Sequence, residues 1–186
     1  MARPQDRREV TDVRALSALA HPVRAALLSH LMAVGPRTAS ECAPVVGASA
    51  SNCSWHLRHL AKFGLVEPVA TADGRERRWR AAATGFAFTA AGPAGRAAEH
   101  ALGVVQLDEE DRLSRASLRE ADELPEDWRV ASGLSTYGLL MSPAELTALR
   151  ARLDALIRPY IAMTREDAPP DARPVHLGLR AFRRPE

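Results

Sequence analysis

Two capped helices in close succession constrain the fold of this chain more than any other feature. Thr38 and Glu41 have the T-x-x-E spacing of a capping box, which predicts that a short helix begins there. Gly47 can adopt the positive φ that ends a helix. Ser49 can then cap a second helix, because its hydroxyl accepts a hydrogen bond from an amide of the first turn. Two helices joined by so short a glycine-containing turn form a helix-turn-helix.

The second of these helices has two faces of different chemistry. Apolar side chains recur at helical spacing on one face, at Ala50, Cys53, Leu57 and Leu60. The opposite face carries polar, aromatic and cationic side chains, at Ser51, Trp55, Arg58 and Lys62, flanked by Asn52 and His59. No acidic residue lies between Ser49 and Lys62. The pattern favours a helix in a DNA groove, because nothing on this face repels phosphate and its side chains can reach base edges.

A basic hairpin follows the second helix. Residues 65–69 read as a strand, Asp73-Gly74 is a hairpin signal, and residues 77–81 read as the return strand. Positive charge is concentrated on this hairpin, at Arg75, Arg77, Arg78 and Arg80. Trp79 is expected to pack on the domain while its neighbours stay in solvent. The segment therefore predicts a wing beside the helix-turn-helix.

Residues 16–88 resemble the winged helix of the ArsR (arsenic-repressor-like) transcriptional regulators. The resemblance depends on A-L-A-H-P-V-R at Ala18–Arg24, S-A-S-N-C-S-W-H-L-R-H-L at Ser49–Leu60, G-L-V-E at Gly64–Glu67, and the arginine-rich wing. It implies a homodimer that binds a palindromic operator and usually represses transcription, with a small-molecule effector that alters DNA affinity. In this family the first helix and the helix after the wing form the dimer interface.

These features predict a set of DNA contacts. We expect the bases to be read by Ser51, Asn52 and Trp55, together with Arg58. We expect contacts mainly to phosphates or the minor groove from Ser49, Ser54, His56, Arg75, Arg77 and Arg78. Trp55 has an alternative, which is to fold back on the wing or on a neighbouring domain.

Composition narrows the classes of protein to which this chain can belong. The apolar content of 46% supports a folded core, and the net charge of only +2 makes the basicity local. No apolar run approaches the ~20 residues of a membrane span. The 2 cysteines cannot build a secreted disulfide scaffold, so the cytoplasm is the expected compartment. No catalytic motif is present, so we expect neither an enzyme nor a cofactor.

The rest of the chain completes the predicted architecture. Helices are expected at residues 11–20 and 22–34, residues 85–89 are expected to prolong the return strand, and a long helix is expected at 92–124. The last third predicts extended chain at 128–141, as one strand or a hairpin around Gly133, then a helix capped by Ser142 and a closing strand at 175–179. The predicted class is α+β and mostly α. It comprises a winged helix-turn-helix domain at 11–90, then a dimerisation helix and a small α+β extension at 91–186, which serves dimerisation or effector binding.

Two other functions fit the same fold. One is a protein-interaction module whose groove-facing residues contact a partner protein. The other is a metal-responsive member of the resembled family. Against metal binding, Cys42 has Ser40 and Pro44 where a paired thiol would stand, and Cys53 lies on the apolar stripe. Structural roles are expected for both cysteines, and no metal site is expected.

Overall fold

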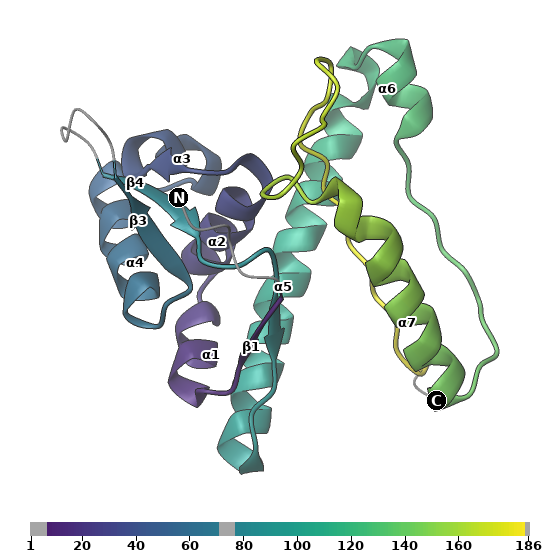
Figure 1. Ribbon diagram of the computed structural model, residues 1–186, viewed down its shortest axis with the longest axis horizontal. Helices are drawn as coiled ribbons and strands as arrows, with labels where there is room; N and C mark the ends of the chain where they lie inside the picture. Colours follow the sequence, from purple (N-terminus) through teal and green to yellow (C-terminus); the bar gives the residue numbers. More distant parts are fainter. Residues whose placement is uncertain (1–6, 71–76, 185–186) are drawn as a thin grey trace. The chain divides into compact units, whose positions relative to one another are not determined.

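The computed structural model describes residues 7–70 and 77–184, and the chain divides into two compact units. The first unit comprises Met1–Glu109 with Tyr160–Val175, and the second comprises Glu110–Pro159 with His176–Glu186. The described residues are mostly helical and include two small sheets in the N-terminal half (Figure 1). The predicted mostly helical α+β class, with a winged helix-turn-helix followed by a long helix, is confirmed.

The first five helices follow the predicted order. They are α1 (Val13–Leu19), α2 (Pro22–Val34), α3 (Ala39–Val46), α4 (Ala50–Lys62) and the long α5 (Gly92–Glu120). After α5 come a 3₁₀ turn (Ala121–Glu123), α6 (Glu126–Ala131), α7 (Pro143–Ile157) and a second 3₁₀ turn (Arg158–Tyr160). No helix of the described residues is long and apolar enough to cross a membrane.

The predicted caps set the boundaries of the helix-turn-helix. Thr38 Oγ1 accepts from the Glu41 amide at 3.2 Å, and the Thr38 amide donates to the Glu41 carboxylate at 2.7 Å, which is a complete capping box. Gly47 ends α3 with φ 64°, a conformation that glycine adopts without steric cost. Ser49 Oγ then accepts from the Asn52 amide at 3.2 Å and begins α4.

The strands form two separate sheets. Strands β2 (Arg37–Thr38), β4 (Arg78–Ala81) and β3 (Val66–Val69) pair antiparallel in that order, with Val66 opposite Ala81. Figure 1 shows α3 and α4 beside this sheet. Strand β1 (Arg8–Val10) pairs in parallel with β5 (Phe86–Phe88). Residues 86–88 therefore belong to a second sheet and do not prolong the return strand.

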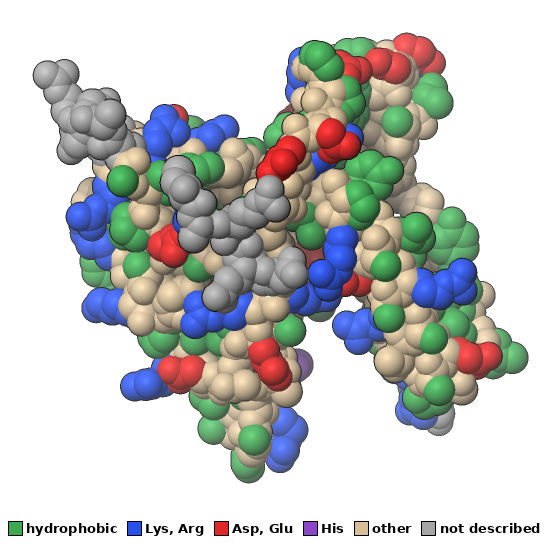
Figure 2. Space-filling view, in the orientation of Figure 1, with side chains coloured by type: hydrophobic (Ala, Val, Ile, Leu, Met, Phe, Trp, Pro, Cys, Tyr) green, Lys and Arg blue, Asp and Glu red, His purple; other side chains and the backbone are tan. Residues whose placement is uncertain are grey.

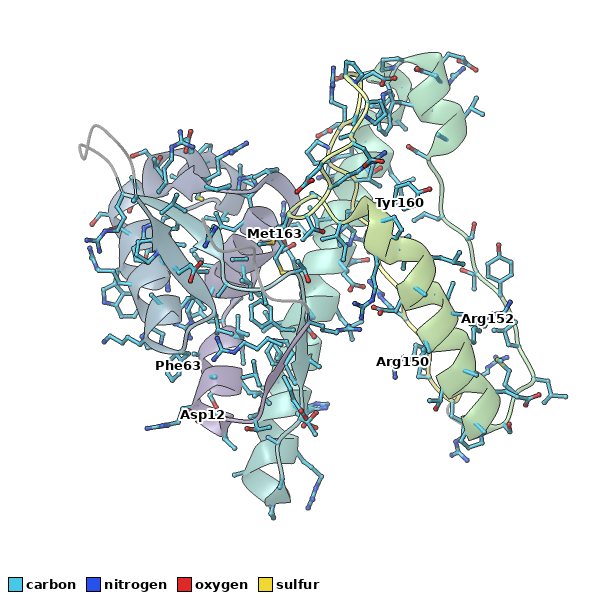
Figure 3. The ribbon with its side chains drawn as sticks, in the orientation of Figure 1. Asp12, Phe63, Arg150, Arg152, Tyr160 and Met163 are labelled. Carbon is cyan, nitrogen blue, oxygen red and sulfur yellow. The ribbon has the colours of Figure 1, made fainter. Side chains whose placement is uncertain are left out.

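One apolar core holds the first unit together. Its fully buried side chains come from the first four helices and from the start of the hairpin, and include Leu16, Leu27, Leu31, Cys42, Leu57, Leu60 and Leu65. Trp79 of the return strand is 4% exposed and packs in this core, as predicted. Met163 packs against the same core (labelled in Figure 3). The α4 helix is thus fixed by its apolar face.

The second unit has regular helices but no buried side chain among its described residues. Its helix α7 begins at a capping box in which Ser142 Oγ accepts from the Glu145 amide at 3.3 Å. Many of its large apolar side chains are exposed, at Leu118, Val130, Leu134, Tyr137, Leu139, Leu140, Leu156, Leu177, Leu179 and Phe182.

The strands predicted for the last third are wrong. Residues 126–131 form α6 and residues 132–142 have no regular structure. No strand is assigned to the described residues from 174 to 184 either. The alternating apolar residues there have no neighbouring strand among the described residues, and an isolated extended segment is not stable as a strand.

Candidate nucleic-acid interface

The α4 helix presents its polar face because its other face is buried. Cys53, Leu57 and Leu60 are each 0% exposed. Since residues three and four apart share one face of a helix, this burial turns the opposite residues outward. Ser51, Asn52, Trp55, Arg58 and Lys62 are exposed, as the periodicity predicts. The helix therefore offers a continuous surface without acidic side chains, and Figure 2 shows Lys and Arg side chains along the edge that α4 forms.

Aromatic contacts hold Trp55 on this surface. The indole is 53% exposed, so it is not buried against the described strands of the wing. Its ring stacks on His59 with centroids 5.6 Å apart and an interplanar angle of 20°. Its other ring contact is edge-on with His56 at 4.8 Å.

A shallow pocket lies on the second half of the same face. It is lined by Trp55, Arg58, His59 and Lys62. The sequence pattern already places Lys62 on the polar face of the helix and His59 beside it. Their positions four and seven residues after Trp55 are the signal that identifies them, because this spacing returns to the same helical face. Arg58 is oriented by Ser54, whose Oγ accepts from Arg58 Nη1 at 3.1 Å.

His56 does not lie on the exposed outer face of α4, contrary to the sequence prediction that it contacts DNA. Its side chain is 4% exposed and its ring packs against His21 with centroids 4.7 Å apart. The Nδ1 atoms of both histidines are buried and have no hydrogen-bond partner among the described residues. The physical reason is helical phase: His56 follows Cys53 by three residues and precedes Leu60 by four, so it belongs to the inner stripe. It supports α4 from within.

The wing arginines have unequal freedom to meet DNA. Arg78 Nη2 is paired with the Glu41 carboxylate at 2.9 Å, and Arg78 Nη1 donates to the Pro36 carbonyl at 3.1 Å. Arg80 is paired with Glu67 across the β3–β4 ladder at 2.6 Å. Arg77 is exposed, with its guanidinium 5.7 Å from the centroid of Trp79. The hairpin signal Asp73-Gly74 and the predicted contact Arg75 lie outside the described residues.

The electrostatics beneath α4 favour neutral histidines. Burial lowers the pKa of His21 and of His56, and the nearby Arg24 guanidinium lowers both pKa values further. Burial likewise lowers the pKa of His59, again with Arg24 acting in the same direction. The positive charge of this surface therefore comes from Arg58 and Lys62 and not from imidazolium groups.

The thiols are enclosed in the core. Cys42 and Cys53 are free and 0% exposed. Burial raises the pKa of Cys42 to about 11 and raises that of Cys53, so both are held as thiols near neutral pH. No group of three or more His, Cys, Asp or Glu side chains that could hold a metal ion lies within residues 7–70 and 77–184.

The comparison with protein families agrees with the helix-turn-helix geometry. Residues 19–69 match the model of a family described as "Helix-turn-helix domain". That segment covers α2, α3, α4 and β3 completely. The chain therefore contains a helix-turn-helix domain, a class of domain that binds DNA through its second helix.

Two solved structures are similar to the chain. One is the solution NMR structure of the homodimeric winged helix-turn-helix DNA-binding domain of a possible ArsR-family transcriptional regulator from Mycobacterium bovis. It is 25% identical, covers 54% of this chain and 79% of that chain, and has a TM-score of 0.35. The other is a probable transcriptional regulator from Pseudomonas aeruginosa, 20% identical over 77% of this chain and 89% of that chain, with a TM-score of 0.32. No curated protein matches the chain.

Proposed function

We propose that this protein is a DNA-binding transcriptional repressor of the ArsR type that acts as a homodimer on a palindromic operator. The observation that carries the proposal is the exposed, acid-free outer face of α4 within a helix-turn-helix domain. Each α4 enters a major groove, and the two-fold axis sets half-sites about 34–36 Å apart. This role needs no catalysis, and the cytoplasmic location stays a prediction.

The contacts divide by position along the helix. Ser51, Asn52 and Trp55 read bases, because they are exposed on the first turns of α4, where a recognition helix reaches base edges. Arg58 and Lys62 hold phosphates, together with Arg77 of the wing, since all are exposed cations. Ser49 and Ser54 can add hydroxyl contacts to the backbone. Arg75 keeps its predicted role as a wing contact.

Arg78 contributes less than the sequence suggests. To bind a phosphate, its guanidinium must exchange the Glu41 carboxylate, which lies at 2.9 Å, for the DNA. That exchange offsets part of the gain. His56 is left out of the contact set because it is buried.

The charge pattern of α5 supports a homodimer. The acidic run 108–111 is followed by the basic residues Arg112, Arg115 and Arg119. In an antiparallel copy of α5 the acidic run faces residues 114–117 of the partner helix, where Arg115 would exchange its Asp111 partner for the other copy. A parallel copy brings like charges together. Centred between residues 112 and 113, the same arrangement places Leu107 opposite Leu118, which are 49% and 62% exposed. A two-fold axis produces such a self-complementary contact.

The domain limits and the effector remain part of the proposal. Residues 11–90 bind DNA, and residues 91–186 serve dimerisation or bind a small-molecule effector. A metal-responsive role based on the cysteines is not favoured, because metal binding requires thiolates and burial raises the pKa of both thiols.

The salt dependence of DNA binding tests the proposal. The full-length protein is titrated into a labelled random duplex at a series of salt concentrations, as wild type and as Arg58→Gln/Lys62→Gln/Arg77→Gln. Each lost phosphate contact is expected to flatten the slope of log K against log salt by about 0.9. Arg150→Gln/Arg152→Gln on α7 is the control with exposed arginines outside the domain (labelled in Figure 3), and it keeps the wild-type slope.

An unchanged slope in the triple variant contradicts the proposed surface. Absence of binding to any duplex at low salt favours the protein-interaction module instead. Sedimentation of the protein across a concentration series tests the dimer separately, since a monomer at all concentrations contradicts the α5 contact.

A further inference from the structure

Trp55 is unusual because about half of its large apolar side chain is exposed to solvent. An indole buries more apolar area than most side chains when it is covered, so 53% exposure leaves a large apolar surface without a partner. The exposure is not a consequence of mobility on a loop, because Trp55 lies in the middle of α4. The ring is also held from two sides, by the stacked His59 and by the edge contact with His56. It is a rigid apolar wall that faces outward.

The surroundings of this wall suit one nucleotide. Arg58 and Lys62 stand beside the indole in the pocket that His59 completes. An apolar wall flanked by two cations matches the chemistry of a nucleotide in duplex DNA, which offers an apolar group on the base edge and a negative phosphate next to it. The imidazole behind the indole adds no charge to the wall, because burial lowers the pKa of His59.

The major groove restricts what an apolar wall can meet there. The bases are stacked, so their faces are not available to the indole. Among the base edges, the only apolar group in the major groove is the C5-methyl of thymine. The edges of guanine, adenine and cytosine carry polar atoms in the major groove. An indole placed against these atoms would remove them from water without offering hydrogen bonds in return, and this costs binding free energy.

We propose that Trp55 reads the C5-methyl group of a thymine in each half-site, while Arg58 and Lys62 hold the phosphates beside that nucleotide. The inference depends on the proposed function, since it assigns a base preference to the helix that enters the groove. It makes the indole a specificity-determining contact, and it makes His59 a positioning residue that acts through the indole.

The test removes the methyl group alone. The full-length protein first selects preferred sequences from a random duplex pool. The best duplex is then synthesised again with each thymine replaced in turn by deoxyuridine, which keeps the base pair but lacks the methyl. For the wild type we expect one position in each half-site where the loss weakens binding about fourfold, and about 15-fold when both half-sites are changed, from the transfer of one buried methyl group each.

Variants separate this contact from general effects on the fold. In Trp55→Ala the difference between thymine and deoxyuridine should disappear, and in Trp55→Phe it should persist in part, because a smaller ring still covers some of the methyl. Tyr160→Ala removes another exposed aromatic residue, 66% exposed and outside α4, and should keep the full wild-type difference. Thermal unfolding of each variant checks that the domain is intact.

Three outcomes would overturn the inference while leaving the proposed function standing. One is selective DNA binding with no methyl-sensitive position. Another is a set of selected sequences that contains no thymine in the half-sites. The third is methyl sensitivity that survives in Trp55→Ala. Failure to bind any duplex overturns the proposed function itself, and the inference with it, so the two failures are distinguishable.

Discussion

The two units of the chain use the same local signals and differ in what they bury. Helices α4 and α7 each begin at a serine cap with a hydrogen bond to an amide of the first turn. Yet α4 has Leu57 and Leu60 at 0% exposure, whereas Leu156 of α7 is 69% exposed. Capping therefore sets where a helix begins, but burial decides whether it belongs to a cooperative core. The winged helix-turn-helix has such a core within one chain, and the second unit has none among its described residues.

Truncating one leucine in each unit is the most direct test of this difference in burial. Leu57→Ala should lower the free energy of unfolding by about 2–5 kcal/mol, through lost burial and the cavity it leaves. Leu156→Ala should change it by less than about 0.5 kcal/mol, because the side chain is already in solvent. Urea unfolding at low protein concentration measures both.

Similar losses in the two leucine variants would contradict the comparison. If the loss in Leu156→Ala grew with protein concentration, a second copy of the chain would be what covers α7, because mass action ties such a loss to association.

Removing the serine cap of α4 or of α7 tests the same difference between the units, with a smaller expected effect on stability. Ser49→Ala should lower the global free energy of unfolding by about 1 kcal/mol, since α4 unfolds together with the core. Ser142→Ala removes an equivalent cap, but we expect it to reduce amide protection only in the first turns of α7, because that helix opens locally. Urea unfolding with hydrogen exchange distinguishes the two effects. A global loss in both variants would mean that the second unit unfolds cooperatively with the first.

The smallest expected effect is a pH dependence confined to the first unit. The pKa values of His21 and His56 lie below the ordinary 6.5 in the folded protein, mainly because of burial. The unfolded chain therefore binds more protons once the pH falls below about 6.5, and the free energy of unfolding should decrease from there until the lowered pKa values are passed. His21→Gln/His56→Gln should make this decrease shallower between about pH 7.5 and 5.5.

Urea unfolding across that pH range measures the slope. Part of it should remain in the double variant, because burial also lowers the pKa values of His30 and His59. A slope as steep as that of the wild type would show that the buried pair does not titrate on unfolding.

The short-range signals were read correctly from the sequence. The capping box of Thr38 and Glu41, the left-handed Gly47 and the cap at Ser49 each involve residues within a few positions of one another. The inner face of α4 is equally predictable from the sequence, because the helical period alone assigns Cys53, Leu57 and Leu60 to one stripe. From these followed the helix-turn-helix and the exposure of Arg58, whereas the placement of Trp55 stayed open.

Long-range contacts explain the features that the sequence did not predict correctly. The pairing of β1 with β5 joins segments on either side of the helix-turn-helix. No local pattern in either segment predicts that it pairs with the other. The Arg78–Glu41 ion pair links the wing to α3, so a side chain expected to meet DNA is already occupied. The strands expected in the last third failed for the opposite reason, because alternation predicts a strand only where another strand can pair with it.

By itself, the sequence determined the helices of the first unit, their caps and the chemistry of the outward face of α4, because these depend on spacing along the chain. Tertiary structure alone decided that His56 packs on His21, that Arg78 meets Glu41, and that the second unit leaves many of its large apolar side chains exposed. The physical reason is that burial and charge pairing depend on which distant surfaces meet, and a local pattern carries no information about that meeting.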